Sequence, residues 1–245
     1  MYNTDGKRGM HAHRMPRQPW IWIVLMPCHA GDRPCQTQEC EMGLPMSSTD
    51  IVLNADFDIT SEDIAISADD FEYLVSKIRT IPDFPAKGIL FRDFMPVFAD
   101  AKAFSILMHA MEAALPVPVD QIDVVAGLEA RGFLFGPALA AHLGKGFVAV
   151  RKAGKLPPPT KKESYSLEYG EAAIEVESNI ITEGQRVLIV DDLIATGGSA
   201  RAARNLLQAC GATIAGFSFV MELDGLDGIE RLGDYPTSSL LRMPA

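Results

Sequence analysis

Cysteine is scarce in this chain. Only four of the 245 residues are cysteines, and three of them, Cys28, Cys35 and Cys40, lie within the first 50 residues. Domains that depend on a disulfide framework carry many more cysteines for their size. The composition therefore argues against such a framework and favours a reducing compartment, and we expect the protein to be cytoplasmic.

The chain also lacks an excess of positive charge and a long apolar run. It has 22 Lys and Arg against 32 Asp and Glu, a formal net charge of -10, whereas binding to nucleic acid by charge needs a clustered basic face. Its one membrane-like stretch, Trp20 to Met26, is far shorter than the ~20 apolar residues of a spanning helix. We expect no nucleic-acid partner and no membrane partner.

The first 60 residues lack a sustained hydrophobic period. Basic residues before Trp20 resemble the start of a secretory signal peptide, but Pro27 and Cys28 stand where small cleavage-site residues belong. The His and Cys residues of this region lack the paired spacing of structural zinc sites. We predict a disordered N-terminal extension over residues 1–60 and a folded domain over 61–245; a translation start at Met46 stays an alternative.

Strand and helix patterns alternate through the rest of the chain. Ser67 followed by Asp70 predicts a helix start, and apolar spacing predicts further helices at 101–115, 133–143 and 196–209 and strands at 122–126, 147–150, 185–190 and 213–223. Residues 164–170 and 172–177 alternate like an antiparallel pair. The Pro-rich segments 81–98 and 151–164 predict loops, the second one mobile. The fold class so predicted is α/β, with a mainly parallel sheet flanked by helices.

The stretch "VLIVDDLIATGGSA", residues 187–200, joins an apolar strand to two carboxylates and a helix start. Asp191 and Asp192 follow the strand, where ligands of open α/β sheets bind. Five small or hydroxyl residues then open a helix, whose unpaired N–H groups and positive dipole end favour a phosphate; they are Ala195, Thr196, Gly197, Gly198 and Ser199. This second half predicts an anion site.

Like charges repel, so the two carboxylates do not bind the same phosphate. They suit vicinal hydroxyls or a metal ion held through water, and a diol together with a phosphate describes a ribose 5-phosphate. The stretch lacks the lysine of a GxxxxGK[ST] loop and the spacing of GxGxxG. The residues thus predict a sugar-phosphate site without naming the rest of the ligand.

The same stretch resembles the 5-phosphoribosyl-1-pyrophosphate (PRPP) signature of the type I phosphoribosyltransferases. Four more segments, "FPAKGILFRDFMPVF", "GLEARGFLFGPALA", "RKAGKLPPPT" and "SYSLEYG", resemble the motifs of the adenine-specific branch of that family, in the same order. The resemblance runs from about Phe71 to the C-terminus. It implies the type I fold with a small hood and loop region, Mg²⁺ bound mainly through PRPP and water rather than by protein ligands, and a homodimer.

The implied reaction transfers the phosphoribosyl group from PRPP to adenine, giving AMP and pyrophosphate in purine salvage. By resemblance, Asp191 and Asp192 bind the ribose hydroxyls, and the 195–199 segment binds the 5-phosphate. By the same resemblance, the pyrophosphate is bound by the turn residues Glu129, Ala130 and Arg131 and by the loop residues Arg151 and Lys155. The first peptide bond of that turn is often cis in the family.

The resemblance also assigns the base and the proton transfer. Phe91 and Leu193 would enclose the adenine ring, while backbone groups near Leu90 and Arg92 read its edge. Glu168 matches a glutamate that exchanges a proton with the purine, and with Arg131 it completes the predicted catalytic pair. One departure is Pro158, where the family usually has Gly, and it would stiffen the loop.

Two rival functions stay open at this level. A sister enzyme for a 6-oxopurine would carry the same donor site, and a regulator would bind PRPP or AMP without turnover. The regulator would need an attached helix-turn-helix or a basic RNA-binding face, and residues 1–60 contain neither pattern.

Overall fold

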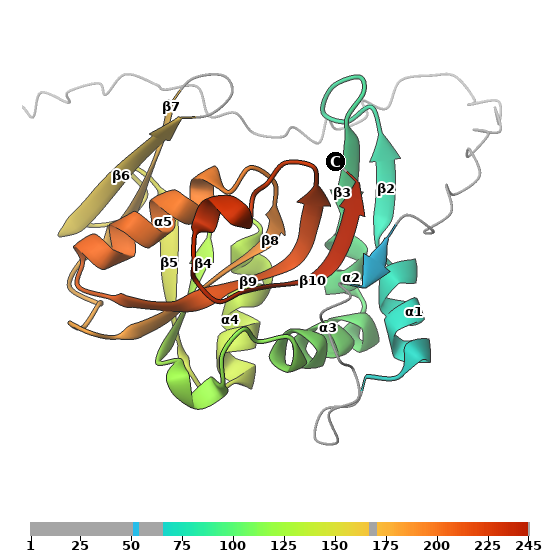
Figure 1. The fold of residues 1–245 in the computed structure, drawn as a ribbon, viewed down its shortest axis with the longest axis horizontal. Helices are drawn as coiled ribbons and strands as arrows, with labels where there is room; N and C mark the ends of the chain where they lie inside the picture. The colour runs from blue at the N-terminus through green and yellow to red at the C-terminus, as the bar shows by residue number, and fades with distance from the viewer. Residues whose placement is uncertain (1–50, 54–65, 167–170, 245) are drawn as a thin grey trace, which may run out of the picture. The chain divides into compact units, whose positions relative to one another are not determined.

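A computed structural model describes residues 51–53, 66–166 and 171–244 of the chain (Figure 1). These residues belong to one compact unit, Gly43–Ala245. Most of the predicted extension, including its signal-like and metal-like residues, lies outside the described residues. From residues 1–60 only 51–53 are described, and strand β1 (Val52–Leu53) pairs antiparallel with β10 (Thr237–Pro244). The predicted division at residue 60 stays a prediction.

The described residues form one large sheet with the strand order β1-β10-β9-β8-β4-β5-β7-β6. The parallel centre contains β9 (Thr213–Asp224), β8 (Arg186–Ile194), β4 (Val124–Leu128) and β5 (Gly146–Lys152). The antiparallel ribbon adds β7 (Glu171–Glu177) and β6 (Thr160–Ser166) to β5. Pairing is parallel from β10 through β5 and antiparallel for β5–β7 and β7–β6. The predicted α/β class with a mainly parallel sheet is confirmed.

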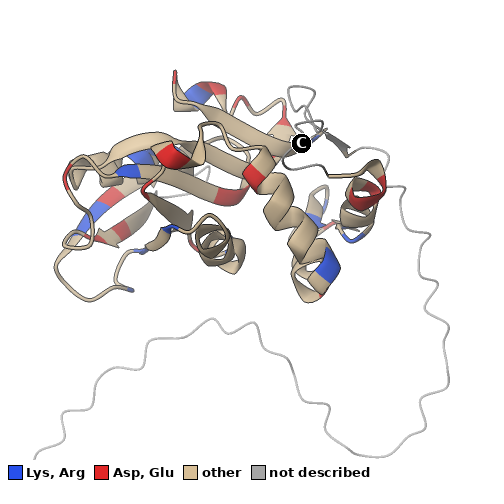
Figure 2. Cartoon of the chain, turned by 90° about the horizontal axis from the view of Figure 1, so that it is seen from below, with Lys and Arg blue, Asp and Glu red and all other residues tan. Residues whose placement is uncertain are grey.

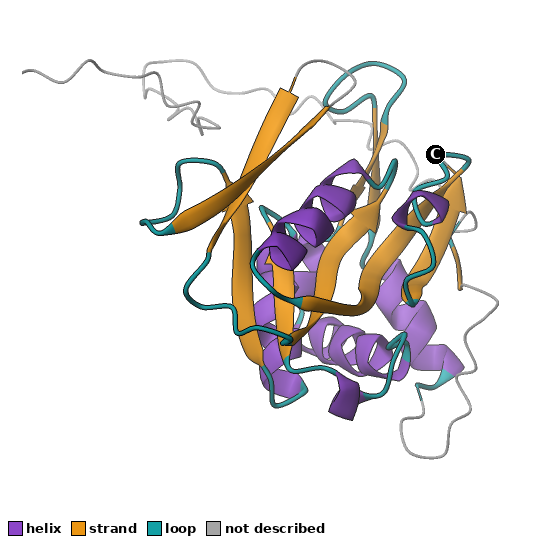
Figure 3. Ribbon diagram, turned by 60° about the vertical axis from the view of Figure 1, so that its left-hand side comes forward, coloured by secondary structure: helices purple, strands orange, loops and turns teal. Residues whose placement is uncertain are grey.

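Helices cover both faces of this sheet. Helices α1 (Ala68–Ser76), α3 (Ala101–Ala113) and α4 (Gly132–His142) lie on one face, and α5 (Gly198–Ala209) lies on the other (Figures 1 and 3). Side chains alternate accordingly, because successive strand residues point to opposite faces: Leu188 and Val190 of β8 pack with α3 and α4, whereas Val187 and Ile189 pack with α5. The central strands are buried on both sides and therefore read as continuous apolar runs.

The predicted helices lie within a few residues of their expected bounds. Ser67 caps α1, and its hydroxyl accepts a hydrogen bond from the Asp70 amide, as the pattern predicted. Asp100 caps α3 in the same way through the Ala103 amide. Residues 160–166 and 171–177 form an antiparallel pair; this confirms the predicted second arm, whereas the first arm begins at residue 160 rather than 164, and residues 167–170 lie outside the described residues.

Two loop predictions were wrong in part. Residues 81–98 contain the end of the hairpin β2 (Arg79–Pro82) and β3 (Leu90–Asp93) and the short helix α2 (Met95–Ala99); a proline ends β2 and another opens α2, positions that tolerate a missing N–H. In the second segment, residues 160–164 belong to β6, so the loop is confined to 153–159. The strand β10 had no counterpart in the predictions.

The charged residues of the described parts are interspersed. Figure 2 shows Lys and Arg segments and Asp and Glu segments on several elements. Among the same residues, none of the helices combines the length and apolar character that crossing a membrane requires.

Candidate functional site

The two predicted donor carboxylates lie at the carboxyl end of β8, which the structure extends through both of them to Ile194. Asp192 is buried, with 1% of its surface exposed, and Asp191 is half-buried. The Asp191 carboxylate turns back to accept a 3.0 Å hydrogen bond from the Asp192 amide. The strand end thus holds two adjacent carboxylates, one buried and one half-buried.

A positive group lies beside the deeper carboxylate. Arg131 Nε is 2.9 Å from Asp192 Oδ2, although no described donor makes an aligned hydrogen bond to that oxygen. Arg131 ends the 129–131 turn between β4 and α4, and the Glu129–Ala130 peptide bond in this turn is cis, as the resemblance implied. The turn after β4 and the end of β8 therefore meet at the same edge of the sheet.

Burial raises the pKa of both carboxyl groups. For Asp191 the shift is the larger one, because the charge of Asp192 adds to the burial, and its pKa lies well above the ordinary range. For Asp192 the neighbouring Arg131 charge opposes the effect of burial. Burial and the Asp191 carboxylate also raise the pKa of the Tyr165 hydroxyl. The site lies in a poorly solvated region where charge is costly without a partner.

The predicted phosphate segment connects β8 to α5. Gly197 is the N-cap of α5 at φ +74°, and no side chain caps the helix, so its first N–H groups point toward the loop without a side-chain acceptor. A hollow of about 330 Å³ opens beside Gly198 and is lined in part by Tyr165, Arg201 and Asn205. An anion is the ligand that this helix start suits best.

Gly228 supports the phosphate segment from behind. It lies in the loop after β9, and its carbonyl oxygen would be 2.6 Å from a Cβ on Gly197. A Cβ on Gly228 would lie 2.2 Å from the Ala195 carbonyl oxygen. The two backbones are therefore closer than side chains would allow, and both positions require glycine.

The predicted base residues come from the hairpin and from β8. Phe91 of β3 packs edge-on against Phe84 at 5.1 Å, and the Arg131 guanidinium lies 5.7 Å from the Phe91 ring centre. Leu90 is 44% exposed, and its register partner Pro82 has no N–H to offer it. Phe91 thereby adjoins the carboxylate edge through Arg131, while Leu193 extends β8 beyond Asp192.

Two more predicted residues lie near the loop 153–159. Arg151 Nε is 3.3 Å from Glu129 Oε2, and its Nη1 donates a 3.3 Å hydrogen bond to the Lys155 carbonyl.

Arg92, which the base prediction included, is buried and donates a hydrogen bond to the Thr80 hydroxyl across the hairpin. Glu168, the predicted proton-transfer residue, lies outside the described residues.

The chain matches the family model for the phosphoribosyl transferase domain over residues 108–238. An adenine phosphoribosyltransferase of Bifidobacterium adolescentis is 72% identical over 180 residues, which cover 74% of this chain and 93% of that protein. This chain belongs to the adenine phosphoribosyltransferases. The relative from Corynebacterium diphtheriae is 48% identical over 174 residues, 71% of this chain and 94% of its own length.

Solved adenine phosphoribosyltransferases share the fold. The enzyme of Rhodothermus marinus superposes with a TM-score of 0.67 at 43% identity and covers 72% of this chain and 100% of its own. The enzyme of Saccharomyces cerevisiae, solved with an imino-altritol bisphosphate and adenine, gives a TM-score of 0.65 at 46% identity over 71% of this chain and 99% of its own.

The described residues contain no group of three or more His, Cys, Asp or Glu side chains suited to a metal ion. The Asp192 oxygen without an aligned donor and its neighbour Asp191 are oxygen ligands of the kind that Mg²⁺ and its bound water prefer. The two carboxylates therefore fit a metal ion that is held through its bound water rather than by direct protein ligands.

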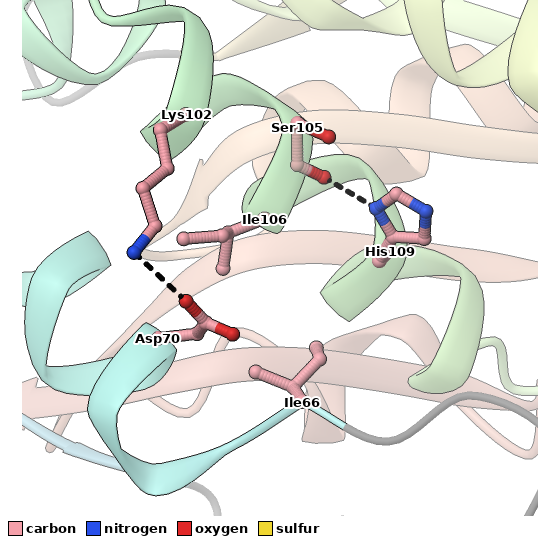
Figure 4. Close-up of a pocket in the computed structure, with 6 residues that line it drawn as sticks. All are labelled: Ile66, Asp70, Lys102, Ser105, Ile106 and His109. Atoms are coloured by element: carbon pink, nitrogen blue, oxygen red, sulfur yellow. Dashed lines mark hydrogen bonds and ion pairs between the residues drawn. The ribbon is translucent and has the colours of Figure 1, made fainter.

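A separate hollow of about 450 Å³ lies between α1 and α3 and contains none of the predicted site residues (Figure 4). Its charged groups satisfy each other, since Lys102 Nζ is 3.2 Å from Asp70 Oδ1. His109 is likewise engaged, with Nδ1 2.8 Å from the Ser105 carbonyl. This hollow has the features of a packed helix interface.

Sequence reasoning missed two residues near the site, Gly228 and Glu175. Gly228 lies in a Gly- and Asp-rich turn, which predicts a turn but not its contact with Ala195 and Gly197 of the phosphate segment. Glu175 is one acidic residue in an alternating strand, and its 1% exposure is a property of the folded sheet. Alternation places Glu175 on the same face of β7 as Ala173 and Glu177, so the sequence pattern predicts an exposed acid and gives no signal of its burial.

Proposed function

We propose that this chain catalyses transfer of the 5-phosphoribosyl group from PRPP to N9 of adenine, giving AMP and pyrophosphate for purine salvage. The observation that carries the proposal is the pair of carboxylates next to an uncapped helix start at the end of β8. The 72% identical relative with that name supports the choice of base.

Asp191 and Asp192 receive the ribose hydroxyls of the donor, and the segment 195–199 receives its 5-phosphate. The carboxylates accept hydrogen bonds, whereas the helix start donates them. A ligand with a diol at one end and a phosphate at the other satisfies both halves at once. The protein thereby binds the ribose 5-phosphate part of the donor, which PRPP and AMP have in common.

The leaving pyrophosphate carries several negative charges, which the acidic chain offsets with local cations. Arg131 and the residues of the loop after β5 supply these, with the turn Glu129–Ala130 presenting Arg131. Mg²⁺, when bound, neutralises pyrophosphate oxygens and strengthens the leaving group. Breaking the bond to C1 leaves an oxocarbenium-like ribose, which the adjacent carboxylates stabilise electrostatically.

Adenine lies between Phe91 and Leu193, and the backbone near Leu90 and Arg92 reads its edge. Pro82, the register partner of Leu90, has no N–H and cannot donate a hydrogen bond across the hairpin. The backbone at Leu90 therefore has one partner fewer within the hairpin, which supports its role in binding the base. A 6-oxo base presents a hydrogen-bond acceptor where adenine presents a donor. With such a base, the backbone groups that bind the adenine edge would be buried without a hydrogen bond. This mismatch is the source of base selectivity.

The reaction is tested by incubating the protein with PRPP, Mg²⁺ and each of adenine, hypoxanthine and guanine, and by following nucleotide formation. AMP from adenine, with far slower reaction of the other two bases, is the expected result. Product only with hypoxanthine or guanine would make the chain a 6-oxopurine enzyme. Binding of PRPP with no product from any base would make it a regulator.

Glu168 exchanges a proton with the purine ring in this proposal. Replacing Glu168 with alanine is expected to lower kcat by about 10²–10⁴, the usual contribution of general acid–base help, and to leave the KM for PRPP within about threefold. Steady-state kinetics with both substrates check this. Glu177→Ala, which removes a carboxylate of β7, serves as the control; an equal loss in both variants contradicts the assignment.

We also propose that the protein is a cytoplasmic homodimer, by likeness to its family. Its low cysteine content supports the reducing compartment. Light scattering of the purified protein in solution checks the dimer, and a mass of one chain at micromolar concentration would refute it.

A further inference from the structure

Glu175 is a buried carboxylate in the middle of the β5–β7–β6 ribbon. Only 1% of its surface is exposed. Its register partners are Arg151 on β5 and Lys162 on β6, so the acid lies between two basic residues of neighbouring strands. Residues directly opposite in an antiparallel pair share a face of the sheet.

The Glu175 carboxylate binds the backbone of the loop 153–159. Its Oε1 accepts hydrogen bonds from the amides of Lys155, at 2.6 Å, and Leu156, at 2.8 Å, while Lys162 Nζ is 3.6 Å from Oε2. Burial by itself raises the pKa of Glu175, but the amides of Gly154, Leu156 and Lys155 outweigh burial and lower it. Glu175 is therefore an ionised group inside the protein.

Lys155 is held from its other side as well. Its carbonyl accepts a hydrogen bond from Arg151, whose Nε pairs with Glu129. Glu129 Oε2 in turn accepts the Lys152 amide at 2.9 Å. A continuous chain of contacts thus runs from Glu175 through the Lys155 backbone and Arg151 to Glu129, two residues before Arg131.

A buried charge seldom serves stability alone, because a well-packed apolar side chain of similar volume stabilises as well or better. What the carboxylate adds is geometry, since one oxygen fixes the amides of two consecutive loop residues. Without it, the loop loses the side chain that fixes these two amides, and the Lys155 carbonyl that Arg151 binds is no longer held in place from the other side. Loops that present several donors to a charged ligand bind best when they are held in place beforehand.

We propose that Glu175 is a positioning residue that fixes the 153–159 loop in the conformation that receives the pyrophosphate end of the donor. The proposal rests on the function proposed above, because it takes pyrophosphate as the loop's ligand. Glu175 touches neither the base nor the ribose in this arrangement. Its loss therefore affects pyrophosphate and PRPP and spares adenine and AMP.

The test compares Glu175→Gln with Glu177→Gln, the same change on the same strand at a side chain without a hydrogen bond or ion pair among the described residues. Titration calorimetry of the purified proteins measures magnesium pyrophosphate and AMP separately. We expect Glu175→Gln to weaken pyrophosphate binding about tenfold or more, as for loss of a charge-assisted hydrogen bond, and to change AMP binding less than twofold. Glu177→Gln is expected to match wild type with both ligands.

Hydrogen exchange at the amides of residues 154–156 gives a second readout that needs no turnover. These amides are expected to exchange faster in Glu175→Gln and to keep wild-type rates in Glu177→Gln. Faster exchange with unchanged pyrophosphate affinity overturns the proposal, as does an equal loss of pyrophosphate and AMP affinity. If Glu175→Gln does not fold, Glu175→Asp, which keeps the charge but withdraws it, takes its place with the same expected split.

The proposed function can fail independently. A wild-type protein that binds magnesium pyrophosphate but forms no AMP from adenine refutes the function and leaves the binding test of Glu175 intact. A wild-type protein that forms AMP, with a Glu175→Gln variant of unchanged pyrophosphate affinity, refutes only the role of Glu175.

Discussion

Replacing Gly228 with alanine is expected to raise the KM for PRPP by about 10²-fold. The new Cβ would lie 2.2 Å from the Ala195 carbonyl oxygen and 2.8 Å from Ile194 Cγ1. The first contact is with backbone, so a side-chain rotation cannot relieve it. The segment 195–199 must move by about an ångström, and a displacement of that size at a binding group costs on the order of 10²-fold.

Gly146→Ala is the matched control for this change. It also adds one methyl group to a glycine, but at the exposed start of β5, where the nearest heavy atom to the new Cβ is 3.6 Å away. We expect unchanged kinetics in Gly146→Ala and an unchanged adenine KM in Gly228→Ala. Equal PRPP kinetics in Gly228→Ala and wild type would show that the turn at Gly228 does not shape the phosphate segment.

The arrangement of the proposed donor site was predictable from sequence because its parts are consecutive. Strand, carboxylates and helix start occupy residues 187–200, and their order along the chain is their order in space. The cis bond of the 129–131 turn followed from resemblance rather than from physics. That the 129–131 turn lies beside the end of β8 depends on the strand order. From the sequence, only the general rule that ligands bind at the carboxyl ends of parallel strands indicated this contact.

The parts that sequence reasoning missed depend on contacts between distant segments. The hairpin β2–β3 was read as a loop because Pro82 and Gly88 interrupt its period, whereas cross-strand pairing stabilises it. Glu175 is buried because two strands flank it, and Gly228 matters because it meets the distant segment 195–199. Such features depend on tertiary packing, which a local pattern does not record.

Replacing Asp191 with asparagine is expected to have two effects of opposite sign. PRPP affinity should fall about 10–100-fold, because the asparagine amide nitrogen cannot accept a hydrogen bond from a ribose hydroxyl. The ligand-free protein should become more stable at pH 8, because the change removes one of two adjacent, poorly solvated negative charges. The asparagine oxygen still accepts the Asp192 amide, which Asp191 Oδ1 binds at 3.0 Å.

The sign of the stability change follows from the pKa values. Burial and the neighbouring charge raise the pKa of Asp191 well above its usual range in the folded protein, so the folded state holds this proton more tightly than the unfolded chain does. The resulting stabilisation is present at acid pH and is lost as pH rises through the folded-state pKa. Once pH has risen through that pKa, the ionised pair opposes folding, and the Arg131 contact with Asp192 offsets only part of that cost.

Thermal unfolding at pH 8 and at pH 4, with and without PRPP, measures both effects. Relief of about 1 kcal/mol corresponds to a Tm higher by about 2–4 °C for a domain of this size, and the difference from wild type should shrink toward pH 4. Asp234→Asn, at an exposed aspartate without a described partner, should change neither Tm nor PRPP affinity. A lower Tm for Asp191→Asn at pH 8 would mean that the carboxylate pair stabilises the empty site, and the trade of stability for donor binding would then be wrong for this protein.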